Sequence, residues 1–162
     1  MKESKSAVRL LYASAVFIAS AVVFCAVFAP LLAPYDPSAV SPEEILEHSS
    51  AAHWFGTDAL GRDILSRVIY GARSSVAFAF CSAFCTMALG LSLGMVSGYF
   101  GGLADKSVQC LVALFQGLPG TSLMIAIAAM LPENDFRIII ALTLTSWTGF
   151  SRIVRNEVLR IK

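Results

Sequence analysis

Charged residues are scarce in this sequence: they make up 14% of its 162 residues, whereas hydrophobic residues make up 57%. A soluble domain carries charge on roughly a quarter of its residues, so this composition cannot cover a globular surface. The 12 basic and 11 acidic residues leave a net charge of +1, which excludes a nucleic-acid-binding protein and an acidic disordered tail. The composition also excludes a secreted disulfide scaffold. It predicts a chain whose surroundings are largely lipid.

The sequence also lacks the short motifs that carry chemistry. It has no phosphate-cradling glycine loop, no nucleophile elbow and no paired acids within an apolar stretch, so we predict no catalytic residue and no cofactor. Its four cysteines fall in apolar stretches, where a thiol is most simply a small apolar side chain. The spacing of His48 and His53 matches no zinc signature. We therefore predict no metal site, with a weak metal contact near these histidines as the alternative.

Long uncharged stretches dominate the rest of the chain. A helix needs about 20 mostly apolar residues to cross a hydrocarbon core of about 30 Å. Three stretches are long enough: Leu10–Ala33 with 24 residues, Ser74–Ala104 with 31 and Ser107–Pro132 with 26. A fourth, Ile138–Ser151, is uncharged for 14 residues; this length also fits a re-entrant segment, but its β-branched start favours a span. The prediction is an all-α, polytopic integral membrane protein with three or four transmembrane helices.

The first stretch follows a basic leader that contains Lys2, Lys5 and Arg9, as a secretory signal peptide would. Its apolar part is longer than the roughly 7 to 15 residues of a signal core. Pro30 directly follows the small-residue site at residues 27–29 and suits cleavage poorly. We therefore favour a retained anchor helix over a cleaved signal peptide.

Lysine and arginine collect on one side of this topology, and the positive-inside rule places that side in the cytoplasm. With the N-terminus inside, the inner segments hold eight of the 12 basic residues and the outer segments hold four. We therefore predict a multi-pass membrane protein with a cytoplasmic N-terminus. The predicted order is a cytoplasmic N-terminus at 1–9, a span at 10–33, an extracytoplasmic segment at 34–73, a span at 74–98, a cytoplasmic turn at 99–106, a span at 107–132, an outer turn at 133–136, a span at 137–151 and a cytoplasmic segment at 152–162.

The extracytoplasmic segment 34–73 is expected to carry two helix starts. Ser41-Pro42-Glu43-Glu44 has a capping serine, a proline at the first helical position and acids in the first turn. After Gly56, Thr57 or Asp58 is expected to cap a second helix, whose apolar residues fall at helical spacing. Two acid-to-base pairs spaced i,i+4, Asp58 with Arg62 and Asp63 with Arg67, favour an exposed helix. We predict an amphipathic helix at the outer interface.

Small residues recur every four positions along the second span and form one helix face: Ser82, Thr86, Gly90, Gly94 and Gly98. Such a face lets another backbone approach closely. Packing within the chain is the simpler interpretation, and a subunit interface or pore-lining seam is the alternative. In the third span, Pro119 predicts a kink.

Three blocks of sequence have a recognisable order. The first is His53-Trp54-Phe55-Gly56-Thr57-Asp58-Ala59-Leu60-Gly61-Arg62-Asp63-Ile64-Leu65-Ser66-Arg67 followed by Gly71-Ala72-Arg73, the second is Gly98-Tyr99-Phe100-Gly101-Gly102 with Asp105, and the third is Trp147 with Phe150-Ser151-Arg152-Ile153-Val154-Arg155-Asn156-Glu157-Val158-Leu159. With these blocks, the chain from about Pro34 onward resembles one permease subunit of the dipeptide, oligopeptide and nickel ABC importers, a binding-protein-dependent family with a type-1 transmembrane domain.

The resemblance implies a transport function without catalysis in this chain. Such a permease pairs with a second permease subunit, receives peptides or nickel from an extracytoplasmic substrate-binding protein and is driven by two cytoplasmic ATPase subunits. The residues that match the outer-segment motif are Gly56, Thr57, Asp58, Gly61, Arg62, Asp63 and Arg67, and those that match the approach to the ATPase-coupling loop are Trp147, Arg152, Arg155 and Glu157. ATP hydrolysis would belong to the partners.

Two departures from the family pattern bear on these expectations. The family's third span usually opens with an arginine and, three residues later, an aspartate, but Cys110 and Ala113 stand at those positions. Family permeases also continue beyond the residue that matches Lys162, so we expect an incomplete permease. The alternative is a truncated structural or regulatory membrane protein that binds a partner permease without transporting.

Overall fold

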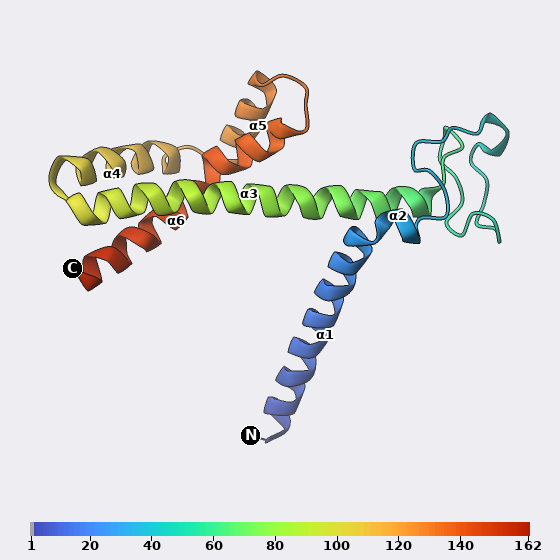
Figure 1. The fold of residues 1–162 in the computed structure, drawn as a ribbon, viewed down its shortest axis with the longest axis horizontal. Helices are drawn as coiled ribbons and strands as arrows, with labels where there is room; N and C mark the ends of the chain where they lie inside the picture. The colour runs from blue at the N-terminus through green and yellow to red at the C-terminus, as the bar shows by residue number, and fades with distance from the viewer. Residues whose placement is uncertain (1) are drawn as a thin grey trace. The chain divides into compact units, whose positions relative to one another are not determined.

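The computed structural model describes residues 2–162, with side chains from Val8 onward, and every regular element in this range is a helix (Figure 1). The predicted cytoplasmic leader at 1–9 therefore lies partly outside the described residues. The chain divides into two compact units, Met1–Ala77 and Phe78–Lys162, and each is described by itself. The elements are α1 (Lys2–Val27), α2 (Ala29–Leu32), the 3₁₀ turn η1 (Pro42–Glu44), α3 (Ile64–Phe100), α4 (Gly102–Gln116), α5 (Gly120–Met130) and α6 (Phe136–Ile161).

In the first unit, α1 ends at Val27, earlier than the predicted span of 10–33. Pro30 lacks the N–H that would continue the helix, and it lies instead in the first turn of the separate four-residue helix α2. The rings of Phe24 and Phe28 pack across this junction, with centroids 4.6 Å apart. The apolar stretch is thus helical as predicted, but proline divides it.

Residues 33–63, called the connecting segment below, join α2 to α3. The predicted helix start at Ser41-Pro42 yields only the three-residue turn η1. The predicted start of a second helix at Thr57 or Asp58 is wrong, because α3 begins at Ile64. Residues 57–63 form a tight loop closed by an isolated antiparallel bridge between Thr57 and Asp63.

From Ile64, α3 continues to Phe100 for 37 residues. A hydrocarbon core needs only about 20. The same helix therefore includes the end of the predicted extracytoplasmic segment, from residue 64 to 73, and the whole predicted span at 74–98. In this part of the chain, the predicted interfacial helix and the predicted span are therefore one continuous helix.

In the second unit, α4 follows α3 through a turn at Gly101 and Gly102, which have φ angles of 65° and 54° (Figure 1). Left-handed backbone of this kind suits glycine. The apolar core gathers on α4 and α6: Val108, Val112 and Trp147 are buried, and Leu93 and Phe115 pack against them.

The stretch predicted as a third span, 107–132, is broken. Helix α4 ends at Gln116, α5 begins at Gly120, and the two helices are bent by 92° at this break. Pro119 lies in the break and precedes α5. The sequence predicts a kink at Pro119 but gives no angle for it.

Within residues 2–162, two helices are long and apolar enough to cross a membrane, α1 over Val8–Val27 and α3. The bent pair of α4 and α5 makes a third if it is one span. Helix α6 contains the predicted fourth span at 137–151, which stays a prediction. The all-helical, polytopic fold class is confirmed.

Candidate functional site

Asp58 organises the loop at residues 57–63. Its Oδ1 accepts hydrogen bonds from the backbone N–H groups of Leu60 and Arg62, at 2.8 and 3.1 Å. Its Oδ2 accepts one from Nε of Arg62 at 2.9 Å and forms ion pairs with Arg62 at 2.8 Å and Arg67 at 3.5 Å. One carboxylate therefore fixes a backbone turn and two arginine side chains.

Two glycines permit this turn. Gly56 and Gly61 have φ angles of 72° and 71°, a left-handed conformation that other residues rarely adopt. A Cβ at Gly56 would clash with the carbonyl oxygen of Glu47, and one at Gly61 would clash with the backbone of Ser41. Both positions thus require glycine for conformation and for close approach.

Asp63 directly precedes α3 and binds the buried ring of His53. Its Oδ2 accepts a hydrogen bond from the N–H of Ser66 at 2.7 Å, the position of a helix N-cap contact. Its Oδ1 lies 3.0 Å from Nδ1 of His53, and both side chains are nearly inaccessible. The ring of Tyr35 lies against this histidine, with ring centroids 4.7 Å apart. The backbone N–H of Tyr35 donates a hydrogen bond to Oγ of Ser66 at 3.1 Å. The beginning of the connecting segment is thereby joined to the start of α3.

This geometry corrects the predicted ion pairs. Asp58 and Arg62 do pair, but across a turn rather than along a helix. The predicted pair of Asp63 with Arg67 is replaced, because Asp63 caps the helix and Arg67 reaches Asp58 instead. The spacing i,i+4 occurs in both arrangements, so spacing alone did not distinguish them.

These contacts shift the pKa values of the three ionisable side chains. The Arg62 guanidinium lowers the pKa of Asp58 to about 2. The hydrogen bond to Asp63 raises the pKa of His53. Burial alone would raise the pKa of Asp63, but hydrogen bonds from Ser66 and His53 outweigh it and lower that pKa. These contacts therefore favour the carboxylate forms of Asp58 and Asp63, and the carboxylate of Asp63 fixes the orientation of the His53 ring through Nδ1.

The loop should lose its order as Asp58 is protonated. Because its pKa in the folded loop, about 2, lies below the ordinary 3.8, ionised Asp58 stabilises the loop above about pH 4, and this contribution disappears as pH falls towards 2. We expect amide hydrogen-exchange protection at Leu60 and Arg62, corrected for intrinsic rates, to fall over that range. Asp58→Asn, whose side chain does not titrate, should weaken the pH dependence and leave only the part that Asp63 contributes. The same pH dependence in Asp58→Asn would contradict this role.

Sequence reasoning missed Tyr35 and Ser66 as members of this site. Asp63 directly precedes the apolar residues Ile64 and Leu65, and an aspartate in that place indicates a helix N-cap that could have revealed the true start of α3. Tyr35 and Ser66 are separated by 31 residues, and no local pattern connects them.

In the second unit, the glycines of the small-residue face pack directly against α6. A Cβ at Gly94 would lie 2.6 Å from the carbonyl oxygen of Ser151 and 2.7 Å from Cβ of Val154. A Cβ at Gly90 would lie 2.9 Å from the side chain of Phe150, and one at Gly98 would lie 2.8 Å from that of Val158. These three glycines thus serve contacts within the chain.

A bidentate ion pair connects α4 to α6 beside this face. Nε and Nη2 of Arg155 each lie 2.6 Å from an oxygen of Asp105, and Oγ of Ser97 donates to the same carboxylate at 2.5 Å. The resemblance led us to expect no ion pair at Cys110 and Ala113. The structure instead has an ion pair nearer the start of α4, between Asp105 and Arg155, which are 50 positions apart in the sequence.

The remaining residues that match the coupling approach lie along α6. Trp147 is buried and makes an edge contact with Phe115, with centroids 5.8 Å apart. Arg152 donates to the side chain of Gln116 at 2.9 Å. Glu157 is exposed, 3.9 Å from Arg160. The four residues therefore do not form one cluster.

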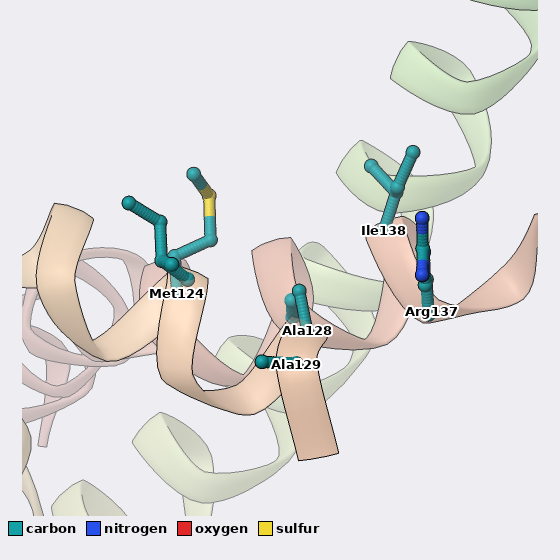
Figure 2. Close-up of a pocket in the computed structure, with 7 residues that line it drawn as sticks. Met124, Ala128, Ala129, Arg137 and Ile138 are labelled. Atoms are coloured by element: carbon teal, nitrogen blue, oxygen red, sulfur yellow. The ribbon is translucent and has the colours of Figure 1, made fainter. Parts of the chain in front are cut away.

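Between α5 and α6 lies a cavity of about 370 Å³ (Figure 2). Apolar side chains such as Met124, Ala128 and Ile138 line it, and Arg137 is the one polar residue among the seven that do. Arg137 in turn lies 4.0 Å from Glu133. This lining holds no nucleophile and no pair of titratable groups, so nothing in it indicates catalysis.

Comparison with known proteins identifies the family. Residues 90–162 match the family described as the binding-protein-dependent transport system inner membrane component. The chain is 36% identical over 141 residues to an oligopeptide transport system permease protein and 38% identical over 146 residues to a dipeptide transport system permease protein, both from Bacillus subtilis. It is 34% identical over 142 residues to a glutathione transport system permease protein from Pectobacterium atrosepticum.

These matches cover 87%, 90% and 87% of this chain but 46%, 46% and 47% of the respective relatives. The chain therefore spans about half the length of the curated relatives it matches. The family match at residues 90–162 includes the second and third blocks on which the resemblance rests, and the resemblance is confirmed. This chain belongs to the family of binding-protein-dependent transport system inner membrane components, the permease subunits of ABC importers.

Proposed function

We propose that this chain contributes to the translocation path of an ABC importer for short peptides in the plasma (inner) membrane. The observation that carries the proposal is the similarity, over most of the chain, to permeases named for oligopeptides, dipeptides and glutathione. Peptides are favoured over nickel as cargo, because none of these relatives is named for nickel.

In this proposal the partners are a second permease subunit, two cytoplasmic ATPase subunits and an extracytoplasmic substrate-binding protein. The ordered loop at residues 57–63 faces the binding protein. The ion pair of Asp105 with Arg155 holds α6 firmly beside α4, near the part of α6 that approaches the ATPases. A rigid contact of this kind suits an element that transmits movement.

Affinity purification of the tagged chain from membranes of its source tests the assembly. We expect a second permease and ATPase subunits in fixed ratio to the chain, and ATP hydrolysis stimulated by a peptide-loaded binding protein. Recovery of the chain with a permease but without ATPase subunits would favour a regulatory role and contradict the proposal.

The orientation proposed from the charge distribution can be measured by cysteine labelling. In a background without the four native cysteines, we expect a membrane-impermeant maleimide to label Ala51→Cys in intact cells whose outer barrier admits the reagent. Lys106→Cys should be labelled only after the membrane is disrupted. Both positions are exposed, so accessibility within the chain does not bias the comparison. The reverse pattern would place the connecting segment in the cytoplasm.

A further inference from the structure

We propose that Glu44, Glu47 and His53 in the connecting segment bind a divalent transition-metal ion, with Zn²⁺ as the representative. One potential ligand atom from each side chain lies within 4.8 Å of the other two. Nε2 of His53 and Oε2 of Glu44 are 3.6 Å apart. A tetrahedral zinc ion with bonds of about 2.1 Å holds its ligand atoms about 3.4 Å apart, so one pair is already close to that spacing.

His53 is oriented as a metal ligand before any ion binds. Its side chain is 6% exposed, and Nδ1 is occupied by the carboxylate of Asp63 at 3.0 Å. A carboxylate accepts a hydrogen bond, so Nδ1 carries the proton and the Nε2 lone pair of the neutral ring is free to coordinate. In the part of the chain that the structure describes, Nε2 has no hydrogen-bond partner, and Glu44 beside it lies beyond hydrogen-bond length.

Thr57 holds the backbone at both glutamates. Its hydroxyl donates to the carbonyl oxygen of Glu44 and accepts from the N–H of Glu47 at 2.9 Å, while its own N–H donates to the carbonyl oxygen of Glu47 at 3.1 Å. Glu44 and Glu47 are themselves exposed. The three ligand atoms already lie within 4.8 Å of one another, so rotation of the two exposed carboxylates is the movement that coordination would require.

The donor set selects the class of ion. One imidazole nitrogen with two carboxylate oxygens suits Zn²⁺ and similar transition-metal ions, whereas Ca²⁺ and Mg²⁺ prefer oxygen ligands alone. Three protein ligands leave a fourth position for water. The bound ion would fasten the turn at Glu44–Glu47 to His53 and, through Asp63, to the start of α3.

Isothermal titration of the full chain in detergent with Zn²⁺ alone tests the site, with a purification tag that contains no histidine. We expect saturable binding of one ion at this site, and at least about tenfold weaker binding in the double variant Glu44→Gln with Glu47→Gln. The matched controls are Glu43→Gln and His48→Gln, which change a neighbouring acid and the other histidine outside the cluster. The four cysteines are present in every variant, so any Zn²⁺ that they bind contributes equally to each titration.

Equal affinity in the double variant and the wild type would overturn the proposal, as would equal weakening by Glu43→Gln. Binding of Ca²⁺ as tight as that of Zn²⁺ would also overturn it, because the histidine would then have no part. Circular dichroism of each variant without metal verifies that the fold is retained.

Discussion

Replacement of Gly94 by leucine is expected to separate α3 from α6 and destabilise the second unit by about 3 kcal/mol or more. Even the first carbon of a side chain at this position would lie 2.6 Å from a backbone oxygen of α6, and a leucine adds three more carbons. The α6 backbone cannot yield as a flexible side chain can, so the two helices must move apart. This movement forfeits close packing along the whole glycine face.

Gly149→Leu is the matched control, because nothing lies within 4 Å of a Cβ at Gly149 and the gain in helix propensity is the same. Leu93→Ala is a poor control, since Leu93 packs against the buried cluster around Trp147. With the exposed Trp54 replaced by phenylalanine, Trp147 becomes the sole tryptophan and its fluorescence reports unfolding. Similar unfolding midpoints for Gly94→Leu and Gly149→Leu would contradict the packing role.

Loss of the ion pair between Asp105 and Arg155 should have the next largest effect. Their side chains are only 22% and 25% exposed, so removing one partner leaves the other a partly buried charge without compensation. We expect Asp105→Asn and Arg155→Gln each to loosen α4 from α6 and lower the unfolding midpoint reported by Trp147.

The double variant separates this coupling from unrelated effects. If the two residues act as a pair, Asp105→Asn with Arg155→Gln should be no less stable than the worse single variant. Arg160→Gln is the control, because Arg160 is 80% exposed and its contact with Glu157 is 3.9 Å. Additive losses in the double variant would show that the residues act separately.

The helices of this chain could be predicted from its sequence because long apolar stretches allow little else in lipid. Their ends could be predicted less well. Pro30 and Pro119 interrupt helices where proline removes a donor, but the sequence contains no measure of the 92° bend near Pro119. The glycine spacing predicted a packing face, and the partner helix α6 follows only from the fold.

The loop at residues 57–63 shows where pattern reasoning fails. Its charge spacing suits a helix, but glycines at 56 and 61 need left-handed backbone and so favour a turn. The contacts of Tyr35 with Ser66, and of Asp105 with Arg155, join residues 31 and 50 positions apart. Such contacts depend on how the elements pack and leave no periodic signal in the sequence.

Peptide uptake tests the central claim most directly. In the source organism, deletion of the gene for this chain should abolish ATP-dependent uptake of a radiolabelled dipeptide or oligopeptide. A plasmid copy of the wild-type gene or of Gly149→Leu should restore uptake, whereas Gly94→Leu should not. Undiminished peptide uptake in the deletion strain, or loss of nickel uptake alone, would contradict the account.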